Sequence, residues 1–308
     1  MKPLAPVILF VYNRPDHTLK TLDALSANIL SAETELIVYA DGAPLHAKKE
    51  ELQKIESVKK IIHAEKRFKK VTVIISEKNK GLANSIVKGV TEVISNYGKA
   101  IILEDDLVTS KYFLSFMNHA LEYFENNDDV ACISGYIYPT KENLPDLFFL
   151  KGADCWGWAT WKKSWDLFEE KGDVLLHKLT SGEHSVDFNF YNTYPYIQML
   201  KDQIAGKNKS WAVRWYASAY LSGKLTLYPG KSLVRNIGFD GTGIHSGRQS
   251  VSYTDFPGTE TIIHPIPVIE NTAAKKQIAA YFKSSLNRKF RSVLKRKINY
   301  LLKKIQGN

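Results

Sequence analysis

The chain has 308 residues, of which 44% are hydrophobic and 12% aromatic. That content is enough for one large α/β domain, or for one domain with an appendage. Its two cysteines, Cys132 and Cys155, make no disulfide framework and favour a reducing compartment. The N-terminal apolar run is too short for a signal sequence, and no stretch has the length of a transmembrane helix. We therefore expect a cytoplasmic protein.

The net charge of +10 comes from the end of the chain. Residues 271–308 hold eleven Lys or Arg and no Asp or Glu. The preceding residues are therefore close to neutral overall. A nucleic-acid-binding protein needs basic residues on its folded domain to contact phosphates. We therefore predict that the protein has no nucleic-acid partner.

Short apolar runs alternate with helical patterns over the first 135 residues. Strands are predicted at 7–12, 36–40, 71–76, 101–103 and 130–134, and helices from Pro15 onward, at 46–64, at 82–95 and at 112–124. This alternation predicts an α/β fold with a doubly wound, mostly parallel sheet. Neither GxGxxG after the first strand nor GxxxxGK[ST] occurs, so a nucleotide would be held through side chains and a metal.

Three consecutive acids, Glu104, Asp105 and Asp106, follow the fourth predicted strand. Adjacent like charges are unfavourable unless a cation lies beside them, and hard cations such as Mn²⁺ and Mg²⁺ prefer oxygen ligands and often bring phosphate oxygens. In open α/β sheets, ligands bind at this edge. The pattern predicts a metal–diphosphate site. The alternative is an acidic turn in which one Asp caps the next helix, although Thr109 and Ser110 are better placed for that role.

Two other predicted strands also end in polar residues. Asn13 and Arg14 follow the first strand, and Asp41 follows the second. Because the carboxyl ends of parallel strands meet at one edge, these side chains are candidates for holding the nucleoside of a bound nucleotide. Asn84, in the helix that begins after Gly81, is a further candidate.

The second half of the chain is rich in aromatic residues. All six tryptophans lie between Trp156 and Trp215. Aromatic faces stack on sugar rings and nucleobases, which makes Trp156 and Trp158 candidates for contacting an acceptor. The alternative is an aromatic layer of the core.

A glycine-rich loop follows at residues 235–245. Gly238, Gly241 and Gly243 lie close together in it, beside Asp240 and His245. Closely spaced glycines indicate that the backbone approaches a ligand. The alternative is a plain surface loop.

The end of the chain has an apolar residue at every third or fourth position, the pattern of one helical face. These residues are Ile278, Phe282, Leu286, Phe290, Leu294, Ile298, Leu301 and Ile305. Basic residues fill much of the rest, and such a helix suits an anionic membrane surface. The alternative is a helix that packs its apolar face on the domain or self-associates. We therefore predict a domain at 1–260, a linker at 261–274 and a basic helical tail at 275–308.

Four segments carry a family resemblance over roughly residues 5–250. They are Tyr12-Asn13-Arg14-Pro15, Ala40-Asp41-Gly42, Glu104-Asp105-Asp106-Leu107 and the stretch from Trp156-Gly157-Trp158 to Trp165. In their order and spacing they resemble the GT-A fold glycosyltransferases, and in particular bacterial sugar transferases related to the Golgi N-acetylglucosaminyltransferase I type. The resemblance implies a nucleotide-sugar-binding half at 1–135 and an acceptor-side half at 136–260.

The resemblance also implies roles for residues at the strand ends. Arg14, with Asn13 beside it, would contact the nucleotide, and Asp41 would hold the uracil or ribose. The acidic triplet is a variant of the DxD motif: Glu104 and Asp105 would face the donor, and Asp106 would bind Mn²⁺ or Mg²⁺ bridging the diphosphate. His245 is a candidate to complete the metal or diphosphate shell, with a structural histidine as the alternative.

One departure from the family pattern concerns the catalytic base. In the Golgi relative, an Asp between two tryptophans has this role, whereas Arg214 stands at that place in the segment Trp211–Trp215. An arginine cannot take a proton. Either the base lies elsewhere, with Asp154 favoured over Asp240 and Asp202 as a further carboxylate, or Arg214 has another task such as holding phosphate.

The expected activity is the transfer of a hexosyl or N-acetylhexosaminyl group from a nucleotide-sugar, in the first place a UDP-sugar, to a glycan or lipid-linked acceptor. The resemblance favours inversion and a role in bacterial surface polysaccharide synthesis. The basic tail would hold the enzyme peripherally at the inner face of the cell membrane. Two alternatives stay open: a nucleotidyltransferase, which usually has a basic glycine-rich loop after its first strand, and a catalytically inactive glycan-binding or scaffold protein.

Overall fold

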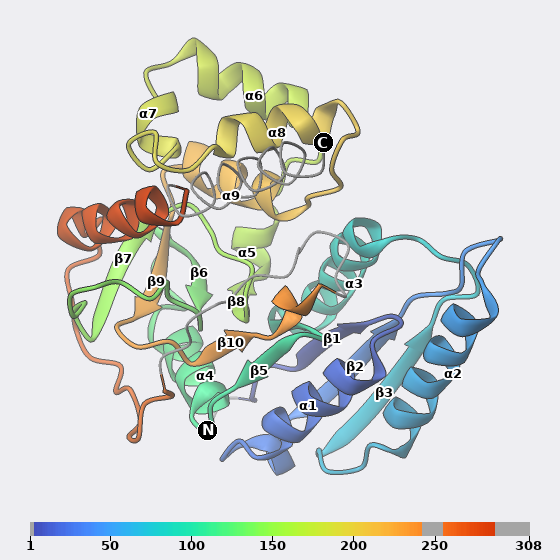
Figure 1. Ribbon diagram of the computed structural model, residues 1–308. Coiled ribbons are helices and arrows are strands. Elements are labelled where there is room, and N and C mark those ends of the chain that lie inside the picture. Colours follow the sequence, from blue (N-terminus) through green and yellow to red (C-terminus); the bar gives the residue numbers. More distant parts are fainter. Residues whose placement is uncertain (1–2, 242–254, 287–308) are drawn as a thin grey trace, which may run out of the picture.

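The computed structural model describes residues 3–241 and 255–286, and Figure 1 shows a central sheet with helices on both faces. The sheet has eight strands in the order β3-β2-β1-β4-β8-β6-β9-β7. The strands are β1 (Val7–Val11), β2 (Glu35–Ala40), β3 (Lys70–Ile75), β4 (Lys99–Glu104), β6 (Val130–Ser134), β7 (Leu147–Lys151), β8 (Trp158–Trp161) and β9 (Leu225–Pro229). Only β7 and β8 run antiparallel to their neighbours in this sheet. The predicted α/β class with a mostly parallel sheet is confirmed.

A second, two-stranded ribbon pairs β5 (Leu107–Thr109) with β10 (Val234–Asn236) in antiparallel orientation. The helices are α1 (Pro15–Ser26), α2 (Lys49–Ala64), α3 (Leu82–Tyr97), α4 (Phe113–Tyr123), α5 (Lys162–Trp165), α6 (Gly172–Ser181), α7 (Ser185–Phe188), α8 (Tyr196–Ile204) and α9 (Ala212–Leu221), with short 3₁₀ turns η1 (Ser31–Glu33) and η2 (Gly238–Asp240). The ribbon joins the glycine-rich loop after β10 to the turn after β4.

The alternation of side chains along β1 explains why both faces of the sheet are covered. Leu9 points into a core formed with α1, α2 and α4. Phe10 points into the opposite core, formed with α3, α5 and α9. Because β1 is buried on both faces, its sequence is an unbroken apolar run rather than an alternating one.

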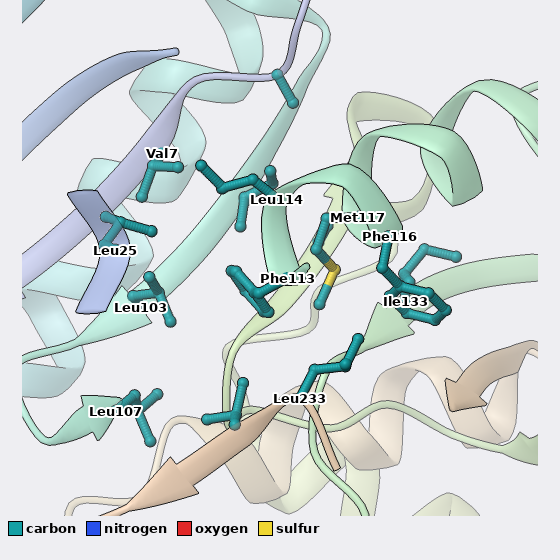
Figure 2. Packing of buried hydrophobic residues seen from close by; sticks show 14 of the residues in the cluster. Val7, Leu25, Leu103, Leu107, Phe113, Leu114, Phe116, Met117, Ile133 and Leu233 are labelled. Atoms are coloured by element: carbon teal, nitrogen blue, oxygen red, sulfur yellow. The ribbon is translucent and has the colours of Figure 1, made fainter. Parts of the chain in front are cut away.

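The turn after β4 rests on the first of these cores. Leu103 and Leu107 flank the acidic triplet, are fully buried and pack near Phe113 of α4 (Figure 2). Burial of the two flanking leucines fixes the backbone of the triplet on both sides. The acids are therefore held at the edge of a rigid sheet rather than on a free loop.

The N-terminus of α4 differs from the sequence prediction. Thr109 lies in β5 and accepts a hydrogen bond from the side-chain amide of Asn28, whereas Ser110 accepts one from the backbone N–H of Tyr112. The backbone N–H of Leu114 in α4 donates to Asn28 Oδ1 over 2.9 Å. A residue distant in sequence thus satisfies a free N–H of this helix.

The second half adds a helical layer, made of α6, α7, α8 and α9, above β7 and β9 (Figure 1). Residues 272–286, drawn in red, are also helical and pack against this layer. We call residues 272–286 the C-terminal helix. Its Ile278 is fully buried and its Phe282 is 3% exposed. The first turns of the predicted tail thus use their apolar face inside the protein, as in the packing alternative.

The predicted linker at 261–274 is also packed against the protein. Ile263, Ile266 and Val268 contact the first core, and Glu270 forms a parallel bridge with Phe149 of β7. The boundaries at 261 and 275 therefore do not mark a free linker followed by a separate tail. The membrane-binding prediction depends on the apolar residues from Phe290 onward, which lie outside the described residues, and it stays a prediction. Within 3–241 and 255–286, no helix is both long and apolar enough to span a bilayer.

A buried lysine fastens the C-terminal helix. Lys275 is 1% exposed and pairs with Asp187 of α7 over 2.6 Å and with Glu270 over 3.0 Å. Burial raises the pKa of Asp187, but the hydrogen bonds from Lys275 and Tyr220 outweigh it and hold that pKa below its ordinary value. One ammonium therefore ties the helix to α7 and to the segment before it.

We predict that Lys275→Met lowers the free energy of unfolding by about 2 kcal/mol, because two carboxylates lose their shared partner while Asp187 keeps part of its hydration. Urea denaturation monitored by tryptophan fluorescence measures this change. The control is Lys276→Met at the exposed neighbouring position, which should leave the transition midpoint unchanged. Equal midpoints for the two variants would contradict the anchoring role.

Candidate active site

The ends of three neighbouring strands meet at one edge of the sheet. β1 lies between β2 and β4, and all three strands are parallel. Phe10 is paired with Glu104 and Val11 with Ala40. The residues that follow each strand are therefore brought together, as the sequence predicted for Arg14, Asp41 and the acidic triplet.

Arg14 clamps two of the three acids. Its Nη1 donates to Asp106 Oδ2 over 2.9 Å, and its Nη2 donates to Asp105 Oδ1. The side chain of Asp105 is 5% exposed. Burial raises the pKa of Asp105 to about 6, although the positive charge of Arg14 opposes this. The guanidinium thus compensates two carboxylates in a poorly hydrated place.

Glu104 has no ion-pair partner within the described residues. Burial, followed by the negative charges of Asp106 and Asp105, raises its pKa to about 8. Three carboxyl groups face one guanidinium at this edge. Among the residues that the structure describes, this leaves negative charge in excess, and oxygen ligands with an excess of negative charge suit a hard divalent cation. No group of three His, Cys, Asp or Glu in the described parts of the chain is already arranged around a common metal position.

The loop after β10 lies directly on Asp106. The backbone N–H of Ile237 donates to the carbonyl oxygen of Asp106 over 2.8 Å. A Cβ atom at Gly238 would overlap Asp106 Oδ2 and contact Arg14. The predicted close approach of this glycine-rich loop is thus to the acidic triplet itself. Gly243 and His245 lie outside the described residues, so the metal-shell role of His245 stays a prediction.

Asp41 organises the backbone beside the site. Its Oδ1 accepts from the N–H groups of Gly42 and Lys80, and its Oδ2 accepts from the N–H of Gly81, each over 2.9 Å. Both carboxylate oxygens of Asp41 are thus already hydrogen-bonded to backbone amides. A contact of Asp41 with a nucleoside stays a prediction. Asn84 is exposed and donates to the carbonyl of Lys80.

Sequence reasoning missed Glu51 of α2. Its Oε1 accepts hydrogen bonds from the hydroxyl of Tyr12 over 2.8 Å and from Asn13 Nδ2 over 3.2 Å. Burial, and then the hydrogen bond to Glu51, raises the pKa of Tyr12 above its ordinary value. Asn13 is thereby oriented at the end of β1. Glu51 belongs to a Lys- and Glu-rich pattern that is typical of a solvated helix face, so no sequence signal distinguished it.

Two more supporting residues lie in α1. Thr21 Oγ1 donates to the carbonyl oxygen of Asp105 over 2.8 Å. His17 Nε2 lies 3.3 Å from Asp240 Oδ2, which connects α1 to η2. The helix after β1 therefore contacts both the triplet and the glycine-rich loop.

The candidate bases lie in different surroundings. Asp154 is half-buried, accepts from the N–H of Cys155 over 2.6 Å and from the hydroxyl of Tyr228 over 3.3 Å, and has its pKa raised by burial. The charges of Asp154, Glu104 and Asp106 all raise the pKa of Cys155, after burial. Both cysteines are free thiols.

Asp240 lies two residues after Gly238, and its side chain is 43% exposed. Asp202 lies in α8, where its carboxylate accepts from Gln198 and faces Lys207. Of the three candidate carboxylates, Asp240 lies in the loop that contacts Asp106, and Asp154 lies two residues before Trp156, whose ring contacts Phe239 of that loop. The contacts of Asp202 are within the helical layer.

Arg214 and Trp158 differ from their predicted roles. Arg214 donates to the carbonyl of Glu170 and its guanidinium lies 5.5 Å from the Phe168 ring centre. These contacts are structural and do not involve the triplet. Trp158 is fully buried and packs against Trp165, Trp211 and Trp215. It therefore cannot contact an acceptor in this conformation, and the aromatic-core alternative holds for it.

Trp156 differs from Trp158 in exposure. It is half-buried and lies edge-on to Tyr136 and to Phe239 of the glycine-rich loop, with ring centres 4.7 and 5.6 Å away. Its place beside that loop keeps it as the acceptor-contact candidate.

Residues 7–163 match the family model described as glycosyl transferase family 2. This match covers half of the chain, and the chain belongs to that family. Its α/β fold is accordingly GT-A-like. The match does not single out the N-acetylglucosaminyltransferase I type, which stays a prediction. No curated protein matches the chain significantly.

Three solved structures show a distant likeness. A mannosyltransferase from Pyrobaculum calidifontis, in complex with GDP-Man and Mn²⁺, is 10% identical over 72% of this chain and 70% of its own, with a TM-score of 0.39. TarS from S. aureus is 14% identical over 75% of this chain and 36% of its own, at 0.38. Glucosyl-3-phosphoglycerate synthase from Mycobacterium tuberculosis, with Mn²⁺ and UDP, is 12% identical over 54% and 58%, at 0.32. The chain thus spans less than two thirds of the last two proteins.

We predict that Arg14→Met lowers the free energy of unfolding by about 3 kcal/mol, since it leaves the buried Asp105 and the half-buried Asp106 without their cation. Urea denaturation of the apo protein measures the change. The matched control is Lys163→Met, which removes an exposed ion pair with Asp128 and should have no measurable effect. Wild-type stability of the Arg14 variant would mean that another group compensates the triplet.

Proposed function

We propose that this family 2 glycosyltransferase is metal-dependent and transfers a hexosyl or N-acetylhexosaminyl group from a nucleotide-sugar, first of all a UDP-sugar, to a glycan or lipid-linked acceptor. A role in bacterial surface polysaccharide synthesis and an inverting course belong to the same proposal. The observation that carries it is the edge formed by Glu104, Asp105 and Asp106, where Arg14 pairs with two of the three carboxyl groups and no ion pair with Glu104 is formed within the described residues.

The residues at this edge fit Mn²⁺ or Mg²⁺. Such cations are commonly held by one or two carboxylates together with phosphate oxygens rather than by a complete protein cage. Asp106 would be the principal ligand, in keeping with its place in the DxD-like triplet. When bound, the metal would neutralise charge on the leaving diphosphate. Arg14 would then be free to turn from Asp106 toward a phosphate, for which its planar fork is suited.

The donor's nucleoside would lie toward β1 and β2. Asn13 is oriented there by Glu51. Asp41 accepts one backbone hydrogen bond from Gly42 and two from Lys80 and Gly81, and so joins the end of β2 to the start of α3. In this proposal Asp41 acts on the nucleoside mainly through the loop that it organises. Asn84 lies in the first turn of α3, where its side chain is exposed and would contact the donor.

Transfer requires a base close to the acceptor hydroxyl. In the proposed step, the acceptor oxygen forms a bond to the anomeric carbon as the bond from that carbon to the phosphate oxygen breaks, with the electron pair leaving on the nucleoside diphosphate. The hydroxyl proton passes to a carboxylate. Asp154 is favoured because it is held by Cys155 and Tyr228 and its pKa is raised by burial, and Asp240 is the second candidate.

The two rival functions are less well supported. A nucleotidyltransferase would place a basic glycine-rich loop after the first strand, whereas Arg14 after β1 is followed by Pro15 at the start of α1. The inactive glycan-binding alternative rests on Arg214 in place of a base. The contacts of Arg214 are with Glu170 and Phe168, and Asp154 offers a carboxylate elsewhere.

A thermal-shift panel tests the donor site. UDP-glucose, UDP-N-acetylglucosamine, UDP-galactose and GDP-mannose are added with and without Mn²⁺ to the wild type, to Asp106→Asn and to Asp202→Asn. We expect a Mn²⁺-dependent rise in Tm with at least one donor, corresponding to about 2.7 kcal/mol at a concentration one hundred times Kd. The shift should persist in Asp202→Asn and disappear in Asp106→Asn. Absence of any nucleotide-dependent shift in the wild type would reject the transferase proposal.

The base is tested by Asp154→Asn and Asp240→Asn, with Asp202→Asn as the control. We expect Asp154→Asn to keep the donor-induced thermal shift and to lose about 10²–10⁴-fold in the rate of nucleoside diphosphate release, the usual effect of removing a general base. A coupled assay for the released diphosphate measures this rate. If Asp240→Asn alone has this effect, the base is Asp240 rather than Asp154.

A further inference from the structure

A continuous series of aromatic rings leads from the acidic edge to the C-terminal helix. It begins at Phe239, next to Gly238, whose backbone contacts Asp106. From there, ring centres follow one another from Phe239 to Trp156 at 5.6 Å, from Trp156 to Tyr136 at 4.7 Å and from Tyr136 to Tyr138 at 5.2 Å. The series therefore starts where the donor's sugar would lie.

The series continues into elements that are distant in sequence. Tyr138 lies 5.8 Å from Tyr281 and 4.7 Å from Phe282, both in the C-terminal helix, and Phe282 lies 4.7 Å from Tyr194. We call Trp156, Tyr138, Tyr194 and Tyr281 the aromatic strip. These four rings are half-buried, whereas Tyr136 and Phe282, which pack between them, are 7% and 3% exposed. The strip thus keeps accessible rings on a fully packed support.

Asp154, the favoured base, is related to the strip in charge and in position. After burial, its negative charge contributes to raising the pKa of both Tyr138 and Tyr194. Asp154 also lies two residues before Trp156 in the chain, which puts the favoured base at the Trp156 end of the strip. Phenol groups and one carboxylate, with ring faces between them, offer both stacking surfaces and hydrogen-bond partners.

The backbone before Tyr194 is held in an unusual conformation. Phe190, Tyr191 and Asn192 have φ values of 48°, 56° and 60°, a left-handed conformation that costs free energy in residues other than glycine. Lys275 stabilises this turn: its Nζ lies 5.6 and 5.7 Å from the ring centres of Phe190 and Tyr191. The C-terminal helix therefore supports the turn that presents Tyr194 and itself supplies Tyr281.

We propose that the aromatic strip binds a neutral saccharide of two or more sugar units, which extends from the acidic edge to Tyr281 of the C-terminal helix. The proposal rests on the proposed function, in that this saccharide is the acceptor. A sugar ring suits the strip because it has an apolar face for stacking and hydroxyls for the phenols and Asp154. An acyl chain would contact the ring faces but would offer no hydrogen bond to the phenol oxygens or to Asp154.

The test uses the full chain and no donor. A printed array of neutral di- to tetrasaccharides of glucose, galactose, mannose and N-acetylhexosamines is probed with the wild type, Tyr138→Ala, Tyr281→Ala and the control Tyr123→Ala, whose ring is 50% exposed at the end of α4. We expect at least one saccharide to bind the wild type and the control equally, and to bind the two strip variants at least about tenfold more weakly, as loss of a stacked ring predicts. Thermal melting verifies that each variant is folded, and Tyr138→Leu or Tyr281→Leu, which removes the ring but keeps an apolar side chain, replaces an Ala variant that is not.

The results of this experiment and of the donor thermal-shift experiment distinguish failure of the saccharide proposal from failure of the transferase proposal. Saccharide binding that depends on the strip, without any nucleotide-dependent shift, would support the strip and assign the chain to the glycan-binding alternative. A donor-dependent shift combined with no binding to any neutral saccharide on the array would leave the transferase proposal intact and overturn this one. Binding that is equal in the strip variants and the control would also overturn it.

Discussion

The ion pairs of Arg14 with Asp105 and Asp106 are the interaction on which the site depends. Three carboxyl groups meet at the end of β4 because the buried leucines on either side fix the backbone there. One guanidinium compensates two of them and leaves Glu104 with a pKa raised to about 8. Without a cation such a cluster would be unfavourable. The same imbalance of charge favours a divalent cation at this edge, and in the proposed function that cation would bind the diphosphate.

Several elements converge on this cluster. The helix after β1 supplies Thr21 to the carbonyl of Asp105, and the loop after β10 has a glycine against Asp106 because a larger residue would overlap the carboxylate. The antiparallel ribbon of β5 and β10 holds that loop in register with the turn after β4. The first half of the chain and the glycine-rich loop of the second half are therefore joined at the acids themselves.

The second half is built around aromatic packing rather than charge. Trp158, Trp165, Trp211 and Trp215 form part of one face of the core, while tyrosines line the region between Asp154 and the C-terminal helix. Lys275, buried between Asp187 and Glu270, makes that helix part of the same unit. The part of the chain that carries much of the positive charge thus begins inside the folded protein, at the far end of the aromatic strip from the acids.

The sequence by itself determined the parallel first half and the position of its acids. Unbroken apolar runs such as that of β1, and Pro15 at the start of α1, are local signals, and the meeting of strand ends follows from parallel pairing. Only the tertiary structure decided which side chains are exposed and which are paired. Trp156 and Trp158 belong to the same aromatic-rich segment of the sequence. In the structure, however, Trp156 is half-buried beside the glycine-rich loop, and Trp158 lies in the core. Glu51, Asn28 and Lys275 act through partners far away in the chain, and such contacts depend on packing that no local pattern encodes.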